Sequence, residues 1–290
     1  MKKIFIIAAV LAVMAALCGC NYGMKMSYIY ENGEKYVAGD REISDEIDTI
    51  NVDYISGDVK IKASDNGLFT IKETSKKELD EARKVHTWVD GGTLYVRYCK
   101  SAKGLELNML DKELTIGIPE GTKLSDVVVK VSSGNTDISC EADDIDLHAA
   151  SGHIDLKQVG NSSNINIHAS SGKVNAEIEN ADNMEIAVSS GKIFLTAGSI
   201  KDFKSSTASG KSEYTFKQVP ENSEISAASG DITIYIPENS DLTAKLSAVS
   251  GDISTEPAFS KEGKTYVSGN GSNSMDVNVA SGDIDIKNLD

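Results

Sequence analysis

The most constraining feature of this 290-residue chain is a Ser-Gly pair that recurs at nearly equal steps. The steps between successive pairs are 18, 20, 19, 19, 20, 21 and 31 residues. A period of this length indicates that one structural unit is repeated and that each unit needs its neighbours to bury its apolar face. The pairs begin at Ser133, Ser151, Ser171, Ser190, Ser209, Ser229, Ser250 and Ser281.

Apolar and polar residues alternate on both sides of each pair. Ile154 and Leu156 follow one pair, and Ile193 and Leu195 follow another. Alternation with a period of two is typical of strands with one buried face, and Ser-Gly provides a bend without a bulky side chain. A further set of turn signals closes each unit, and these lie at residues 141–143, 160–162, 179–181, 220–222 and 237–239.

We therefore predict an all-β fold, a parallel β-solenoid in which each unit of about 20 residues makes one coil. Coils stacked in sequence order at about 4.8 Å would pair their backbones and bring equivalent inward residues such as Ile154, Val174 and Ile193 into contact. A propeller is disfavoured because its blades need about 40–45 residues. A leucine-rich repeat is disfavoured because the units lack a Leu-rich consensus.

The region before the array is β-rich but less regular. We assign residues 41–126 to an N-terminal cap and residues 127–290 to the repeats. Ile55–Ile61 matches a repeat bend, and Trp88–Val96 predicts a hairpin with a Gly-Gly turn. Ser75–Lys84 is predicted to form a short helix.

The last repeat step is longer than the others by about 11 residues, all within Thr255–Met275. Because this stretch is rich in Gly, Ser and Asn, we expect a flexible loop that protrudes from the array.

The N-terminus is typical of a targeting signal. Lys2 and Lys3 precede an apolar stretch shorter than the roughly 20 residues of a spanning helix. It ends in Leu17-Cys18-Gly19-Cys20, which resembles a bacterial lipobox. We expect residues 1–19 to be a lipoprotein signal peptide, Cys20 to carry the lipid, and residues 20–40 to form a tether. The alternative is an ordinary secretory signal that leaves Cys20 as a spare thiol.

Charge and cysteine content limit the function further. The net charge of −15 argues against a nucleic-acid partner, since such binding depends on Lys and Arg that neutralise phosphates. It also argues against electrostatic docking on anionic lipid. Outside the cytoplasm Cys99 and Cys140 are a possible disulfide, and the alternative is two separate buried thiols.

The Ala-x-Ser-Gly-Asp-Ile units, the Ile-Pro-Glu segments before them and the lipobox together resemble a bacterial family of β-strand-repeat lipoproteins of unknown function, also described as a "putative adhesin" family. The resemblance covers roughly residues 45–290. It implies a β-solenoid in the cell envelope and supplies no catalytic residues. The chain departs from the pattern where His153, Lys173, Lys192 and Lys211 replace the frequent Asp after Ser-Gly.

Two sets of residues are weak metal candidates. His148 and His168 occupy equivalent positions in adjacent units, near His153 and several Asp residues, so stacking would bring imidazoles and carboxylates together as for zinc. Asp231, Asp252 and Asp283 all follow Ser-Gly and would form a calcium ladder. The alternative for both sets is an exposed face with no ligand, and we assign no cofactor and no metal.

The sequence thus favours a non-catalytic scaffold or adhesin-like binding protein, held by its lipid at Cys20 on the extracytoplasmic face of a bacterial membrane. Its partner would be an unknown envelope protein or polymer, or a host ligand. The alternative is a carbohydrate-active β-helix enzyme, which would need a suitable pair of carboxylates on one face. A signalling role in the envelope is a third possibility.

Overall fold

The computed structural model describes residues 25–106, 112–256 and 258–289, and they confirm the prediction of an all-β protein. Within these ranges there is no α-helix, only the 3-10 turns η1 (Gly33–Lys35) and η2 (Glu81–Arg83), and no helix could span a membrane. The strands are β1 (Lys25–Tyr28), β2 (Val37–Ala38), β3 (Arg41–Ile43), β4 (Thr49–Ser56), β5 (Asp58–Ala63), β6 (Phe69–Ser75), β7 (His86–Asp90), β8 (Thr93–Arg97), β9 (Ala102–Glu106), β10 (Lys112–Ile118), β11 (Lys123–Ser133), β12 (Thr136–Phe216), β13 (Asn222–Ser229), β14 (Ile232–Ile236), β15 (Leu242–Ser250), β16 (Ile253–Thr255), β17 (Ser260–Glu262), β18 (Thr265–Ser268), β19 (Asn273–Ser281) and β20 (Ile284–Asn288).

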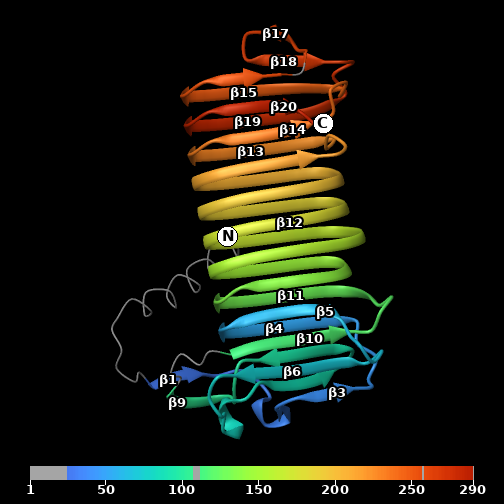
Figure 1. Cartoon of the computed structure of the whole chain (residues 1–290), viewed down its shortest axis with the longest axis vertical. Helices are drawn as coiled ribbons and strands as arrows, with labels where there is room; N and C mark the ends of the chain where they lie inside the picture. The colour runs from blue at the N-terminus through green and yellow to red at the C-terminus, as the bar shows by residue number, and fades with distance from the viewer. Residues whose placement is uncertain (1–24, 107–111, 257, 290) are drawn as a thin grey trace.

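The chain winds into a column of stacked coils whose axis is the long axis of the molecule (Figure 1). The continuous segment β12 passes through four Ser-Gly bends. Equivalent residues of neighbouring coils pair in parallel, as Val129 does with Leu147 and Ser205 with Ile225. The strand register therefore follows the Ser-Gly period of the sequence.

The inward side chains of successive coils form one continuous apolar core. Ile154, Val174 and Ile193, which the sequence placed at equal positions in three coils, are 1%, 0% and 0% exposed. Burying each such side chain stabilises the fold by about 1.5–3 kcal/mol. The core is narrow because residues alternate between the interior and the outer face along every strand.

The glycines of the Ser-Gly bends lie above one another and form a column along the molecule. All nine have positive φ angles, from +104° to +156°. A Cβ on Gly210 would collide with the carbonyl oxygen of Gly191, and each of the others faces a backbone carbonyl in the same way. In stack order, the members are Gly57, Gly134, Gly152, Gly172, Gly191, Gly210, Gly230, Gly282 and Gly251.

The coils do not stack entirely in sequence order, so that expectation is wrong at the C-terminal end. Ser281 pairs with both Ser229 and Ser250, which places β19 between β13 and β15. Likewise β20 lies between β14 and β16. The last coil thereby gains a hydrogen-bonded neighbour on both edges, and its inward residues Ile284 and Ile286 are fully buried.

The insertion that causes the long last step is an ordered hairpin and not the expected flexible loop. β17 pairs antiparallel with β18, and β18 pairs antiparallel with β15. The hairpin therefore covers the free edge of β15, in the outermost coil of the column, which would otherwise expose unpaired backbone groups. It lies at the end of the column in Figure 1.

The N-terminal end of the column is closed by antiparallel strands. β8 and β10 continue the two parallel stacks beyond β4 and β5. β7 then pairs antiparallel with β8, and β6 pairs antiparallel with β10. The predicted hairpin is confirmed, with Gly91 and Gly92 at positive φ in the turn between β7 and β8.

A buried ion pair that sequence reasoning missed holds the cap together. Lys112 Nζ lies 2.7 Å from Glu73 Oε1, and both side chains are almost fully enclosed. Lys112 also donates to the carbonyls of Arg83 and Tyr98, while Glu73 accepts from the Tyr54 hydroxyl. Removing one partner of such a pair costs about 3–5 kcal/mol because the other charge stays buried.

Two local predictions fail in the cap. The helix over Ser75–Lys84 is absent, because β6 continues to Ser75 and only Glu81–Arg83 form a 3-10 turn, capped by the Asp80 side chain. This polar stretch has no apolar stripe to bury, and the Val85 amide is held by Glu73.

The second difference concerns the tether expected over residues 20–40. From Lys25 onward this segment packs on the cap, since β1 pairs with β9 and β2 pairs with β7. The Tyr28 hydroxyl also donates to the Asp53 carbonyl. Only residues before Lys25, which lie outside the described ranges, are left for a tether.

The glycine column gives a direct test. We expect Gly210→Ala to lower the free energy of unfolding by roughly 2–4 kcal/mol, because the new methyl group must displace a neighbouring coil. Lys192→Ala, at the exposed position after Gly191, should stay within about 0.5 kcal/mol of the parent. Denaturant unfolding measures both, and equal losses would contradict a steric role for the glycine.

Candidate functional site

At several bends the residue after the glycine links its coil to the next one through its side chain. The Asn135 amide donates to Asp58 Oδ1 at 2.8 Å, and the His153 amide donates to Asn135 Oδ1 at 3.1 Å. The Lys173 amide then donates to His153 Nδ1 at 3.3 Å. A short side chain with an acceptor is favoured here because it satisfies a backbone N–H at a bend.

The three aspartates considered for calcium take part in the same ladder. The Asp252 amide donates to Asp283 Oδ1 at 2.8 Å, and the Asp283 amide donates to Asp231 Oδ1 at 3.1 Å. The structure thus brings them together, in the order Asp231, Asp283, Asp252. Their position after each bend has a structural use, and the described residues include no group of three or more acidic, His or Cys side chains arranged to hold a metal.

The two equivalent histidines meet on the outer face of β12, as the sequence suggested. The rings of His148 and His168 stack with centroids 4.9 Å apart and an interplanar angle of 15°. His148 Nε2 lies 2.9 Å from Asp146 Oδ1. This contact lowers the pKa of Asp146, whereas burial and then the charge of His148 lower the pKa of His168.

A shallow depression of about 390 Å³ adjoins the histidine pair. Asn164 donates to Asp144 at 2.7 Å there, which links two coils. Two of its three carboxylates, Asp146 and Asp144, are thus already engaged by a histidine and an amide. Its lining residues are Asp126, Val128, Asp144, Ile145, Asp146, Asn164, Asn166 and His168.

Cys99 and Cys140 do not form the possible disulfide, and both are free and buried. Cys99 follows β8 in the cap, whereas Cys140 lies within β12, after the bend at Ser133 and Gly134. Burial raises the pKa of each thiol to about 12. Cys20, the residue expected to carry the lipid, lies outside the described residues.

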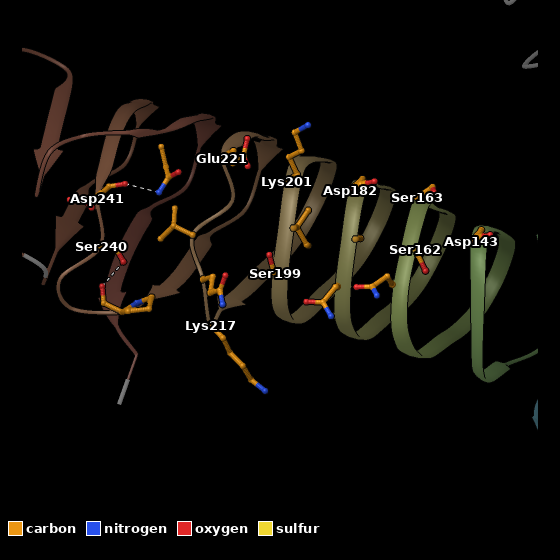
Figure 2. Close-up of a pocket in the computed structure, with 18 of the residues that line it drawn as sticks. Asp143, Ser162, Ser163, Asp182, Ser199, Lys201, Lys217, Glu221, Ser240 and Asp241 are labelled. Atoms are coloured by element: carbon orange, nitrogen blue, oxygen red, sulfur yellow. Dashed lines mark hydrogen bonds between the residues drawn. The ribbon is translucent and has the colours of Figure 1, made fainter. Parts of the chain in front are cut away.

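A second hollow, which we call the corner groove, crosses several coils and has a volume of about 830 Å³ (Figure 2). It lies at the corner marked in the sequence by the second set of turn signals, so that signal could have located it. Its lining residues are Lys123, Asp143, Asn161, Ser162, Ser163, Asn180, Ala181, Asp182, Ser199, Ile200, Lys201, Lys217, Gln218, Val219, Glu221, Pro237, Ser240, Asp241 and Asn273.

Polar groups dominate the corner groove. Some of them hold the corner itself: Ser162 donates to the Ala142 carbonyl at 2.6 Å, and Lys123 lies 2.6 Å from Asp143. In Figure 2 Ser163, Asp182 and Lys201 project from successive coils along one side of the corner. Equivalent positions of successive coils thus present a hydroxyl, a carboxylate and an ammonium group. They are one coil spacing apart, about 4.8 Å, and can each contact the same extended polar molecule.

Comparison with known proteins identifies the family. The model of the Toastrack DUF4097 family, a family of unknown function, matches residues 47–287, so this chain belongs to that family. The resemblance inferred from the repeat units is confirmed at this level. Curated proteins give no match.

Solved structures with similar coordinates include a "putative adhesin" from Bacteroides fragilis (15% identity, covering 88% of this chain and 98% of that chain, TM-score 0.44). Another is a "putative adhesin" from Parabacteroides merdae (15% identity, 91% and 100% coverage, TM-score 0.48). A third is a "putative lipid binding protein" from Parabacteroides distasonis (20% identity, 88% and 97% coverage, TM-score 0.48).

The histidine pair predicts a pH dependence. The folded chain binds a proton at His168 less readily than the unfolded chain, so the free energy of unfolding should fall as pH drops below about 6.5. The fall should end once pH is below the lowered pKa. His168→Asn should reduce the slope of the unfolding free energy against pH. Denaturant unfolding at a series of pH values between 7.5 and 5 measures this slope.

Ser206→Asn is the matched control for that series. It introduces the same side chain on the outer face of β12 and leaves both histidines in place. We expect it to keep the parent slope. A slope unchanged by His168→Asn, or reduced equally by both variants, would contradict the assignment.

Proposed function

We propose that the protein is a lipid-anchored, extracytoplasmic β-solenoid that binds an extended, hydroxyl-rich polymer of the bacterial envelope along its corner groove. The observation that carries the proposal is the continuity of that groove across successive coils. A single coil offers only two or three side chains there. The stack repeats them in register, and such repetition suits a polymer better than a small ligand.

The chemistry of the groove supports a glycan in particular. Serine hydroxyls, amides and mixed charges can each exchange hydrogen bonds with sugar hydroxyls. The lining contains Lys123, Lys201 and Lys217 as well as Asp143, Asp182, Glu221 and Asp241, so neither sign of charge dominates. A neutral or zwitterionic polymer fits this balance better than a polyanion, which the acidic surface of the chain would repel.

The anchor and the location are proposed on the N-terminal sequence. Leu17-Cys18-Gly19-Cys20 supplies the acylated thiol, and the polar, folded region begins only a few residues later. The same processing would place the column outside the cytoplasm, where envelope polymers are available.

Binding is favoured over the alternative, a carbohydrate-active enzyme. Glycosidic cleavage needs two carboxylates free to act as acid and as base or nucleophile. Of the four carboxylates in the groove, Asp143 is paired with Lys123 and Asp241 Oδ1 accepts the Asn270 amide at 2.7 Å, so only Asp182 and Glu221 could serve as such a pair. The described lining also contains no aromatic ring on which a sugar could stack.

The proposal is tested by blocking the groove. We expect the parent protein to bind soluble fragments of bacterial envelope glycan and Ser163→Trp to weaken that binding at least tenfold, about 1.4 kcal/mol, because the indole fills the groove. Ser226→Trp, on an exposed outward position of β13, is the matched control and should bind as the parent does. Titration calorimetry measures all three.

Two outcomes would contradict the proposal. One is a parent protein that binds none of the glycan fragments. The other is unchanged affinity in Ser163→Trp when its melting temperature shows that it is folded. Release of reducing sugar from the fragments would instead favour the enzyme alternative.

A further inference from the structure

The N-terminal cap contains a chain of partly buried aromatic rings, Tyr28, Tyr30, Tyr36, Trp88 and Tyr95, which we call the basal aromatic cluster. Neighbouring rings have centroid distances of 5.3, 4.7, 5.6 and 5.4 Å in that order. The cluster joins the segment before β2 to strands β7 and β8. It lies at the end of the molecule opposite the β17–β18 hairpin, near β1 in Figure 1.

Two exposed aliphatic side chains neighbour this cluster in the sequence, and a third lies elsewhere in the cap. Ile29, between Tyr28 and Tyr30, is 60% exposed, and Val37, next to Tyr36, is 54% exposed. Leu68, in the turn before β6, is a third exposed apolar residue of the cap. Grouped exposed apolar side chains mark surfaces that contact a partner or a membrane.

Cations lie against the rings. Lys35 Nζ is 4.7 Å from the centroid of Trp88, and the Arg97 guanidinium is 5.4 Å from that of Tyr95. Arg97 also lies 6.0 Å from the Tyr30 ring. With Lys35 over Trp88 and Tyr95 stacked on it, the cluster offers ring edges and aliphatic groups more than an open ring face, which disfavours a stacked sugar.

Charge separates this end from the rest of the column. Residues 25–106 carry 13 Lys and Arg against 16 Asp and Glu, a net charge of −3. Residues 112–289 carry 14 against 26, a net charge of −12. All three arginines lie in the first range. An anionic bilayer would therefore repel the column and tolerate the cap.

The chain before β1 keeps this surface close to the proposed anchor. Five residue steps separate Cys20 from Lys25, and they span at most about 18 Å when fully extended. A lipid on Cys20 would thus hold the cap within reach of the headgroups. Tyr and Trp rings flanked by Lys or Arg are the groups that settle at that level of a bilayer.

We propose that the cap surface formed by the basal aromatic cluster, Ile29 and Val37 contacts the lipid bilayer and acts as a second membrane attachment beside the acylated Cys20. This inference rests on the proposed lipid anchor. It assigns the cap end to the membrane and the acidic column, with its groove, to the space beyond it.

Trp88 is the single tryptophan of the chain and reports on this contact directly. The chain from Cys20 onward is coupled through Cys20 to a maleimide lipid in phosphatidylcholine–phosphatidylglycerol vesicles, and the buried Cys99 and Cys140 are spared. Nitroxide-labelled headgroups should quench Trp88 emission about twofold, because the ring lies at headgroup level. Ile29→Ser with Val37→Ser should abolish most of the quenching.

Val159→Ser with Val249→Ser is the matched control, since these are exposed apolar residues of the column. The Trp88 emission of this control should be quenched as much as that of the parent. The proposal is overturned if the tethered parent is not quenched, or if both double variants lose quenching equally while folded. It is also overturned if soluble glycan changes Trp88 emission and vesicles do not.

The chemical tether separates this proposal from the natural anchor. Acylation of Cys20 in cells is measured independently by the mass of the processed protein. An unacylated Cys20 together with quenched Trp88 would contradict the proposed lipid anchor and still support the lipid-contacting surface. An acylated Cys20 without quenching would do the reverse.

Discussion

The close approach of one backbone bend to the next is the constraint on which the rest of the column depends. At nine positions only glycine leaves room for the carbonyl oxygen of the adjacent coil. A methyl group there would separate two coils and break the parallel pairing on both sides of the bend. This explains why the Ser-Gly pair persists while neighbouring outward positions vary from Lys to Asp and His.

Once the coils are in register, the outer face becomes a set of columns with one residue from each coil. Asn, Asp and His in such columns accept backbone amides or pair with their neighbours, as Asn135 and Asn164 do. Residues proposed as metal ligands on sequence grounds therefore have structural partners. The corner groove arises from the same repetition, because the bends there carry short polar side chains in register.

Much of this arrangement could be predicted from sequence because it is periodic. The alternation, the bends, the Gly91-Gly92 hairpin and the stacked His148 and His168 all depend on local spacing plus one repeat. The placement of the last coil between two others could not be predicted, since either order buries the same inward residues. The Lys112–Glu73 pair was missed because its partners are distant in sequence.

The predictions that fail do so because contacts between segments distant in the sequence decide the local structure. Ser75–Lys84 has polar residues that suit a helix, yet hydrogen bonds to the cap hold the flanking chain extended. The tether was predicted from its polarity, but tyrosines that anchor it to the cap lie at irregular spacing. The corner groove needed the coils to be stacked before its polar residues formed one surface.

The two ends of the molecule differ in a way that gives the column a direction. The cap presents aromatic and aliphatic groups with little net charge, and the rest of the chain is acidic and polar. An elongated protein held by its cap would display the groove away from the membrane. On the functions proposed above, anchor, cap and groove would follow one another along a single axis.

The stacking order of the coils is tested most directly by paired cysteines on the outer face. Ser226 and Ser247 each pair with Asn278 in adjacent coils, at the strand spacing that permits a disulfide. Oxidation should therefore cross-link Ser226→Cys with Asn278→Cys, and Ser247→Cys with Asn278→Cys, but not Ser226→Cys with Ser247→Cys. Cross-linking of the last pair, with none to position 278, would show sequential coils and contradict the account.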